Sequence, residues 1–156
     1  MNKIVAALAA ACVLAAAPAA GQDSAGTAEL AALQKAAKAD KRALVAEKLA
    51  LTPAEARKFW SAYDACQGDF AQVTRRRSVA LEGLVARDHP LTDAYAKQIT
   101  NELVAIEEAE VRALRKCASA SLKALPPRKA ARYLQLENKL RAAQDYEIAA
   151  AFPLAQ

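Results

Sequence analysis

Apolar residues recur at helical spacing through two long stretches of the chain. Between residues 52 and 87 they are separated mostly by steps of three and four, the heptad pattern of a helix that packs along its length. These positions are Phe59, Tyr63, Cys66, Phe70, Val73, Ala80 and Leu84, with Arg77 in the one gap. A second stripe consists of Ile99, Leu103, Ile106, Glu110, Ala113, Cys117 and Ala120. The two stripes predict two long helices that pack against each other.

Capping and breaking signals delimit these helices. Residues 51–55, Leu-Thr-Pro-Ala-Glu, supply a Thr cap, a Pro for the first helical position and a Glu that completes a capping box. Residues 88–90, Asp-His-Pro, end the first long helix near residue 87, and Thr92 caps the second. Residues 125–127, Leu-Pro-Pro, then begin a last helix that reaches about residue 150.

A further helix is predicted before these, over residues 28–49. Its rough apolar stripe consists of Leu30, Leu33, Ala37, Leu44 and Leu49. The polar block at residues 38–42 predicts a bend or loose docking. The composition agrees with an all-helical chain, because 43 alanines stand against 4 glycines, and alanine is the best helix former. We therefore expect an all-α fold, with a helical hairpin of two long antiparallel helices flanked by an N-terminal and a C-terminal helix.

Residues 1–21 have the pattern of a secretory signal peptide. Lys3 precedes an apolar run from Ile4 to Ala17, and an Ala-Pro-Ala cleavage site follows. The run is shorter than the roughly 20 residues of a membrane span, and lipidation at Cys12 would leave few apolar residues before it. We expect a periplasmic protein without a transmembrane span after cleavage, with a disordered leader at residues 22–27 and a single helical domain at 28–156.

The net charge is +5, and removal of the signal peptide, which carries Lys3, would leave +4. This excess is mild and spread along the chain, so it does not predict a nucleic-acid partner. An enzyme is not expected either, because no nucleophile with a base can be named and the one histidine, His89, lies in a predicted turn. Glu107, Glu108 and Glu110 have no histidine at metal-ligand spacing, so we predict no metal and no cofactor.

Cys66 and Cys117 occupy the two stripes at one level. If the helices fold back about the turn at residues 88–92, facing residues have numbers that add to about 183, as these two do. In an oxidising compartment this predicts a disulfide, although two buried free thiols are the alternative. A bond closing a loop of about 50 residues would stabilise the fold by about 4 kcal/mol.

The same register sets three consecutive arginines opposite acidic residues. Arg76 is expected to face Glu107, and Arg77 to lie beside Glu107 and Glu110. A charge clasp between the helices and an anion-binding site are both compatible with this run of arginines, and the facing acids favour the clasp. Because exposed ion pairs contribute only about 0–1 kcal/mol each, Arg77→Ala is expected to cost little stability.

Several of these motifs together resemble the Spy/CpxP-like periplasmic proteins, which carry an LTxxQ motif. The residues concerned are the helix start at 51–55, the Phe-Trp-x-x-Tyr-Asp stretch at 59–64, and the C-terminal block from Leu125-Pro-Pro to Phe-Pro-Leu at 152–154. The resemblance covers about residues 42–154. It departs from the family pattern where Glu55 replaces Gln, where the second motif lacks its Thr and Gln, and where metal ligands are absent.

The resemblance implies a four-helix, hairpin-based fold, often dimeric, whose concave surface holds unfolded envelope proteins without ATP or docks on a stress sensor. We therefore expect a holdase-like or envelope-stress protein that binds other proteins, with a structural adaptor for one envelope partner as the alternative. Trp60 lies one position off the apolar stripe and is a candidate client-binding residue. The other candidates are Arg57, Lys58, Arg132 and Arg141, which also lie off the stripes.

Overall fold

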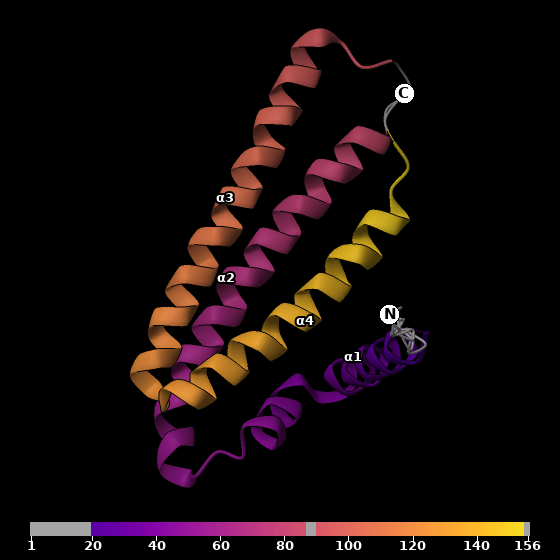
Figure 1. Ribbon diagram of the computed structural model, residues 1–156. Coiled ribbons are helices and arrows are strands. Elements are labelled where there is room, and N and C mark those ends of the chain that lie inside the picture. Colours follow the sequence, from indigo (N-terminus) through magenta and orange to yellow (C-terminus); the bar gives the residue numbers. More distant parts are fainter. Residues whose placement is uncertain (1–19, 87–89, 155–156) are drawn as a thin grey trace, which may run out of the picture.

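The computed structural model describes residues 20–86 and 90–154, and all regular structure within them is helical (Figure 1). The elements are α1 (Ala20–Leu49), α2 (Pro53–Val85), α3 (Asp93–Ala124) and α4 (Pro127–Ala151). The all-α prediction is thus confirmed for this part of the chain. The predicted signal peptide lies almost wholly outside the described residues, and so does the turn with His89. None of the described helices is long and apolar enough to cross a membrane.

The start of α2 follows the predicted capping box. The Glu55 amide donates to Thr52 Oγ1 at 3.3 Å, and the Thr52 amide donates to Glu55 Oε2 at 2.8 Å. Lys129 of α4 adds a long-range contact, because its Nζ donates to Glu55 Oε2 at 2.7 Å and to the Ala50 carbonyl oxygen at 2.7 Å. The Lys129 ammonium is the main cause that lowers the pKa of Glu55. The capping residues therefore also join the beginnings of α2 and α4.

Helix α1 differs from its prediction at its beginning and agrees with it in the middle. It starts at Ala20, so residues 22–27, which we expected to be a disordered leader, are helical. No proline interrupts this segment, and extending an existing helix adds one hydrogen bond for each residue ordered. The expected bend is present at Asp40, whose φ is −156° and ψ is 95°. The Asp40 carboxylate accepts from the Ala43 amide at 2.9 Å and so caps the second half of α1.

The buried apolar side chains form two clusters of unequal size. The larger one draws on all four helices and includes Leu44 of α1, Phe59 of α2, Cys117 of α3 and Tyr133 of α4. The smaller one involves only α2 and α3 and consists of Val73, Ala80, Ile99 and Ile106. The ends of α2 and α3 that approach residues 87–89 are therefore stabilised mainly by each other.

A disulfide joins α2 to α3 inside the larger cluster. Cys66 and Cys117 are bonded, their Cα atoms lie 5.2 Å apart, and both residues are buried. Tyr133 Oη of α4 lies 3.8 Å from Cys117 Sγ. The predicted pairing and the predicted register at this level are confirmed.

The arginine run is arranged differently from the prediction at one position. Arg76 pairs with Glu102 through two hydrogen bonds of 2.5 and 2.8 Å, and not with Glu107. Arg77 does contact Glu107 and Glu110, at 2.9 and 2.5 Å. One residue rotates the side-chain direction by about 100° around a helix. Arg76 and Arg77 therefore point to different sides of α2. A single alignment of α2 against α3 cannot predict the partners of both side chains.

Arg77 belongs to a charge cluster that joins three helices. Its Nη1 donates to Asp145 of α4 at 2.6 Å, in addition to its bonds with Glu107 and Glu110 of α3. Arg141 of α4 also donates to Glu110. Arg77 is only 13% exposed. This cluster holds α4 against α2 and α3, and within the described residues Arg77 is the one cation that contacts all three carboxylates.

We expect Arg77→Ala to lower the free energy of unfolding by about 2 kcal/mol, because it leaves three carboxylates close together in a partly buried site. This reverses the small cost that the sequence predicts. Arg76→Ala is the matched control and should cost at most about 1 kcal/mol, since the Arg76–Glu102 pair is exposed. Urea denaturation of both variants measures the difference, and equal losses would contradict a special role for Arg77.

The cost of Arg77→Ala should also depend on pH. Burial raises the pKa of Asp145 above its ordinary value, and the Arg77 charge opposes that rise. Without Arg77 the folded-state pKa rises further, so the folded protein binds a proton that the unfolded chain, with a pKa of about 3.9, releases. Stability of the variant relative to wild type should therefore recover as pH falls from 7 towards 4. A loss that grows on acidification would contradict this assignment.

Candidate binding face of the α2–α3 pair

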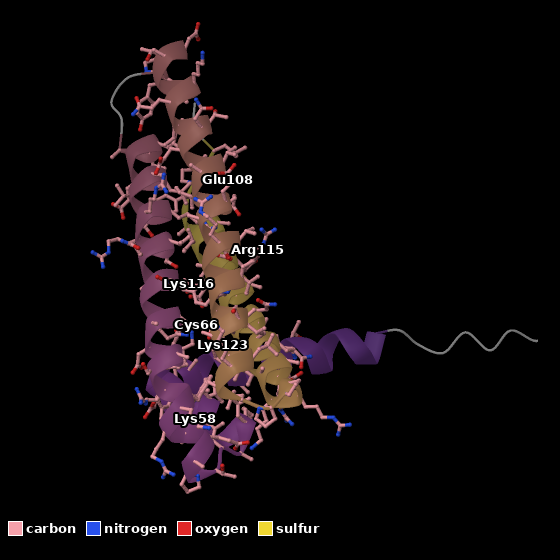
Figure 2. All side chains as sticks on the ribbon, turned by 90° about the vertical axis from the view of Figure 1, so that its left-hand side faces the viewer. Lys58, Cys66, Glu108, Arg115, Lys116 and Lys123 are labelled. Atoms are coloured by element: carbon pink, nitrogen blue, oxygen red, sulfur yellow. A yellow bond between two sulfur atoms is a disulfide. The ribbon has the colours of Figure 1, made fainter. Side chains whose placement is uncertain are left out.

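One face of the α2–α3 pair is left uncovered by the other two helices. Helix α4 packs on the opposite side, where Gln67 of α2 donates to Tyr133 at 3.3 Å and to Glu137 at 3.1 Å. Figure 2 views the molecule with α2 and α3 in front and α4 farther from the viewer. We call the uncovered side the open face. Lys58, Lys116 and Lys123 are visible on the near side in this view.

A groove of about 1240 Å³ runs along the open face, and all its lining residues come from α2 and α3. Its apolar residues are mostly small, namely Ala65, Gly68, Val79, Ala80, Gly83, Tyr95, Ile99 and Ala105. Its polar residues are Asp69, Gln72, Arg75, Arg76, Gln98, Asn101 and Glu102. The helix axis rises by about 27 Å between Ala65 and Gly83. That length corresponds to about eight residues of extended polypeptide.

The groove is shaped at its far end by a close approach between Gly83 and Tyr95. A Cβ atom at position 83 would lie 3.0 Å from Tyr95 Oη. Any larger residue would therefore push the tyrosine away. Val79, which is 62% exposed, lies one turn nearer the middle of the groove. An apolar side chain of a bound partner would find Val79, Tyr95 and Ile99 on the two walls.

The Arg76–Glu102 ion pair lies between the two walls. The hydrogen bond from Arg76 lowers the pKa of Glu102 and raises that of Arg76, so both stay charged over a wide pH range. Arg75 also lines the groove and has no ion-pair partner among the described residues. Together with the amides of Gln72 and Gln98, these groups offer donors and acceptors to the backbone of an extended chain.

Of the five client-binding residues predicted from the sequence, three are exposed and two are held by contacts within the protein. Arg57 and Lys58 are exposed near the start of α2, and Arg132 is exposed on α4. Trp60 is half-buried against Phe59 and Tyr63, and the Arg42 guanidinium lies 4.3 Å from the centre of its ring.

Arg141 is the fifth of these residues, and it belongs to the charge cluster around Arg77 that joins α2, α3 and α4. Besides its bond to Glu110, it donates to Asn138 at 2.7 Å, and its guanidinium lies 4.7 Å from the centre of the Phe70 ring. These contacts occupy the side chain within the protein. The arrangement assigns Arg141 a part in holding α4 in place.

The sequence analysis did not identify the groove. The α2 residues that line it include a second stripe at heptad spacing, beside the apolar one, made of Ala65, Asp69, Gln72, Arg76, Val79 and Gly83. Its mixture of small, polar and charged residues has no apolar periodicity. The one available signal was a valine, Val79, within this otherwise polar or small stripe.

Comparisons of the chain with protein-family models, with curated proteins and with solved structures find no match.

Proposed function

We propose that this protein is a periplasmic, holdase-like protein of the Spy/CpxP type, in which a helical hairpin formed by α2 and α3 binds extended segments of other proteins. The observation that carries the proposal is the groove on the open face, whose wall on α2 is about as long as eight extended residues. Its small apolar lining can contact apolar side chains of many shapes. Its exposed arginines and amides can bind backbone and acidic groups without selecting one sequence.

The expected affinity is modest, which suits transient holding of a client. Full burial of a large apolar side chain contributes about 1.5–3 kcal/mol. A shallow groove covers such side chains only in part, and ordering a flexible client offsets much of the gain. Binding and release of this kind need no nucleotide, since the driving force is removal of apolar client surface from water.

Val79→Asp should weaken the suppression of client aggregation by about tenfold, because it places a hydrated charge on the groove wall where apolar client side chains would lie. Val104→Asp is the matched control. Val104 is also an exposed valine of the α2–α3 pair, 55% exposed, but it does not line the groove. The measurement is light scattering of two unrelated aggregating proteins with increasing amounts of each variant.

The wild type should suppress aggregation of both proteins, and Val104→Asp should do so equally well. If the wild type protects neither at stoichiometric excess, the holdase function is wrong. The adaptor function would then be tested by crosslinking to search for one envelope partner. If both valine variants lose activity equally while remaining folded, the groove is not the binding site.

A further inference from the structure

Unpaired cations gather at the end of the bundle where α2 and α4 begin and α3 ends. We call the set the basic end, and it consists of Arg57, Lys58, Lys123, Arg128 and Arg132. Each of these residues is exposed, and none has an ion-pair partner among the described residues. The only acidic residue in segments 53–60, 113–124 and 127–134 is Glu55, which is already paired with Lys129.

Contacts on three helices bring these cations to one end of the molecule. The Lys129–Glu55 ion pair joins the first turns of α4 and α2. The Cys66–Cys117 disulfide fixes the register of α2 against α3, which sets Lys58 and Lys123 at nearly the same level. Figure 2 shows both lysines in the lower part of the pair and Arg115 higher on α3.

An exposed leucine lies among these charges. Leu122 is 55% exposed and directly precedes Lys123 in the last turn of α3. It follows Arg115 by two helical turns, so the two share one side of α3. A surface that combines exposed cations with an apolar side chain is typical of proteins that lie on anionic lipid, where the cations meet headgroups and the apolar group enters the boundary layer.

The opposite end of the pair is far less basic. Its exposed charges in the described residues include Glu82 in α2 and Asp93 and Lys97 near the start of α3, which largely offset one another. An anionic surface would therefore attract the basic end much more strongly than this distal end. Charge complementarity therefore selects both the partner and the orientation of the protein on it.

We propose that the basic end docks on a membrane surface of anionic phospholipids, with Lys58, Lys123 and Arg128 against the headgroups and Leu122 at the apolar boundary. The pair then stands with its distal end, including Val79 and Tyr95 of the groove, away from the lipid. Attachment at this end does not depend on what the groove binds.

The test is co-sedimentation of the full chain with vesicles of phosphatidylglycerol and phosphatidylcholine in equal parts, and with vesicles of phosphatidylcholine alone. The apolar run of residues 4–17 can bind lipid of either kind, so the quantity measured is the ratio of the two partition coefficients. Each cation near an anionic surface should contribute about fivefold to that ratio. Lys58→Gln with Lys123→Gln should therefore lower it about 30-fold, and added salt should lower it further.

The matched control is Lys35→Gln with Lys97→Gln, which removes the same charge from exposed lysines outside the basic end. This variant should change the ratio by about twofold or less. Equal losses in the two double variants would overturn the proposal, because binding would then follow net charge alone. A wild-type ratio near one would also overturn it. In that case, lysine-dependent binding of polyglutamate would assign the basic end to an acidic protein.

Discussion

Replacing Cys66 and Cys117 together by alanine is expected to lower the free energy of unfolding by about 4 kcal/mol. The bond closes a loop with a sequence separation of 51, and its loss restores that conformational freedom to the unfolded chain. The bond is also a covalent link between α2 and α3 inside the larger cluster, to which all four helices contribute. Urea denaturation monitored by circular dichroism measures the loss.

Wild-type protein unfolded in the presence of a thiol reductant is the control for the cavities that the alanines leave. It should lose nearly as much stability as the double variant. A double variant as stable as the oxidised wild type would mean that packing alone holds α2 and α3 together. Peptide mapping without reduction should show the peptides of Cys66 and Cys117 linked.

Phe59→Ala should cost about 3–5 kcal/mol, the range for emptying a buried phenylalanine site. Phe59 is fully buried, and its ring lies 5.0 Å, centre to centre, from that of Tyr133, which meets it edge-on. The rings of Trp60 and Tyr63 are tilted against that of Phe59, with centre-to-centre distances of 5.3 and 5.9 Å. These rings are large and held by α2 and α4, so they cannot close the space that the missing ring would leave. Thermal and urea denaturation both measure the cost.

Phe59→Leu is the matched control, because it keeps an apolar side chain in the site and should cost much less than Phe59→Ala. If alanine and leucine cost the same, the loss comes from removing the aromatic edge contact and not from a cavity. A loss below about 1 kcal/mol for Phe59→Ala would mean that the aromatic cluster is not the centre of the core.

The helix boundaries of α2 and α3 could be predicted because their signals are local. Thr52 and Glu55 satisfy amides within the same turn, so four consecutive residues contain the information. The bend of α1 could be predicted from the polar block at residues 38–42, and the structure shows that Asp40 within this block caps the helix that follows. The early start of α1 was missed because residues 22–27 contain no proline and no clear capping motif that would mark where a helix begins or ends.

The disulfide could be predicted because two facing stripes and one turn determine a register. A small error in that register still leaves the two apolar stripes facing each other, because stripe residues recur on the same side of each helix. The same error changes the predicted partners of residues beside the stripes. Arg76, for example, was assigned to Glu107 but pairs with Glu102. The higher cost now expected for Arg77→Ala comes in part from Asp145, which lies 68 positions away on α4.

The sequence by itself determined the four helices, the two long apolar stripes and the cysteine pair, because each follows from residues within a few turns or from one antiparallel register. Only the tertiary structure decided which side of the α2–α3 pair is open. That choice depends on where α4 docks, through distant contacts such as Arg77 with Asp145 and Gln67 with Glu137. A groove is surface that no helix covers, and sequence periodicity records what is buried but not what remains uncovered.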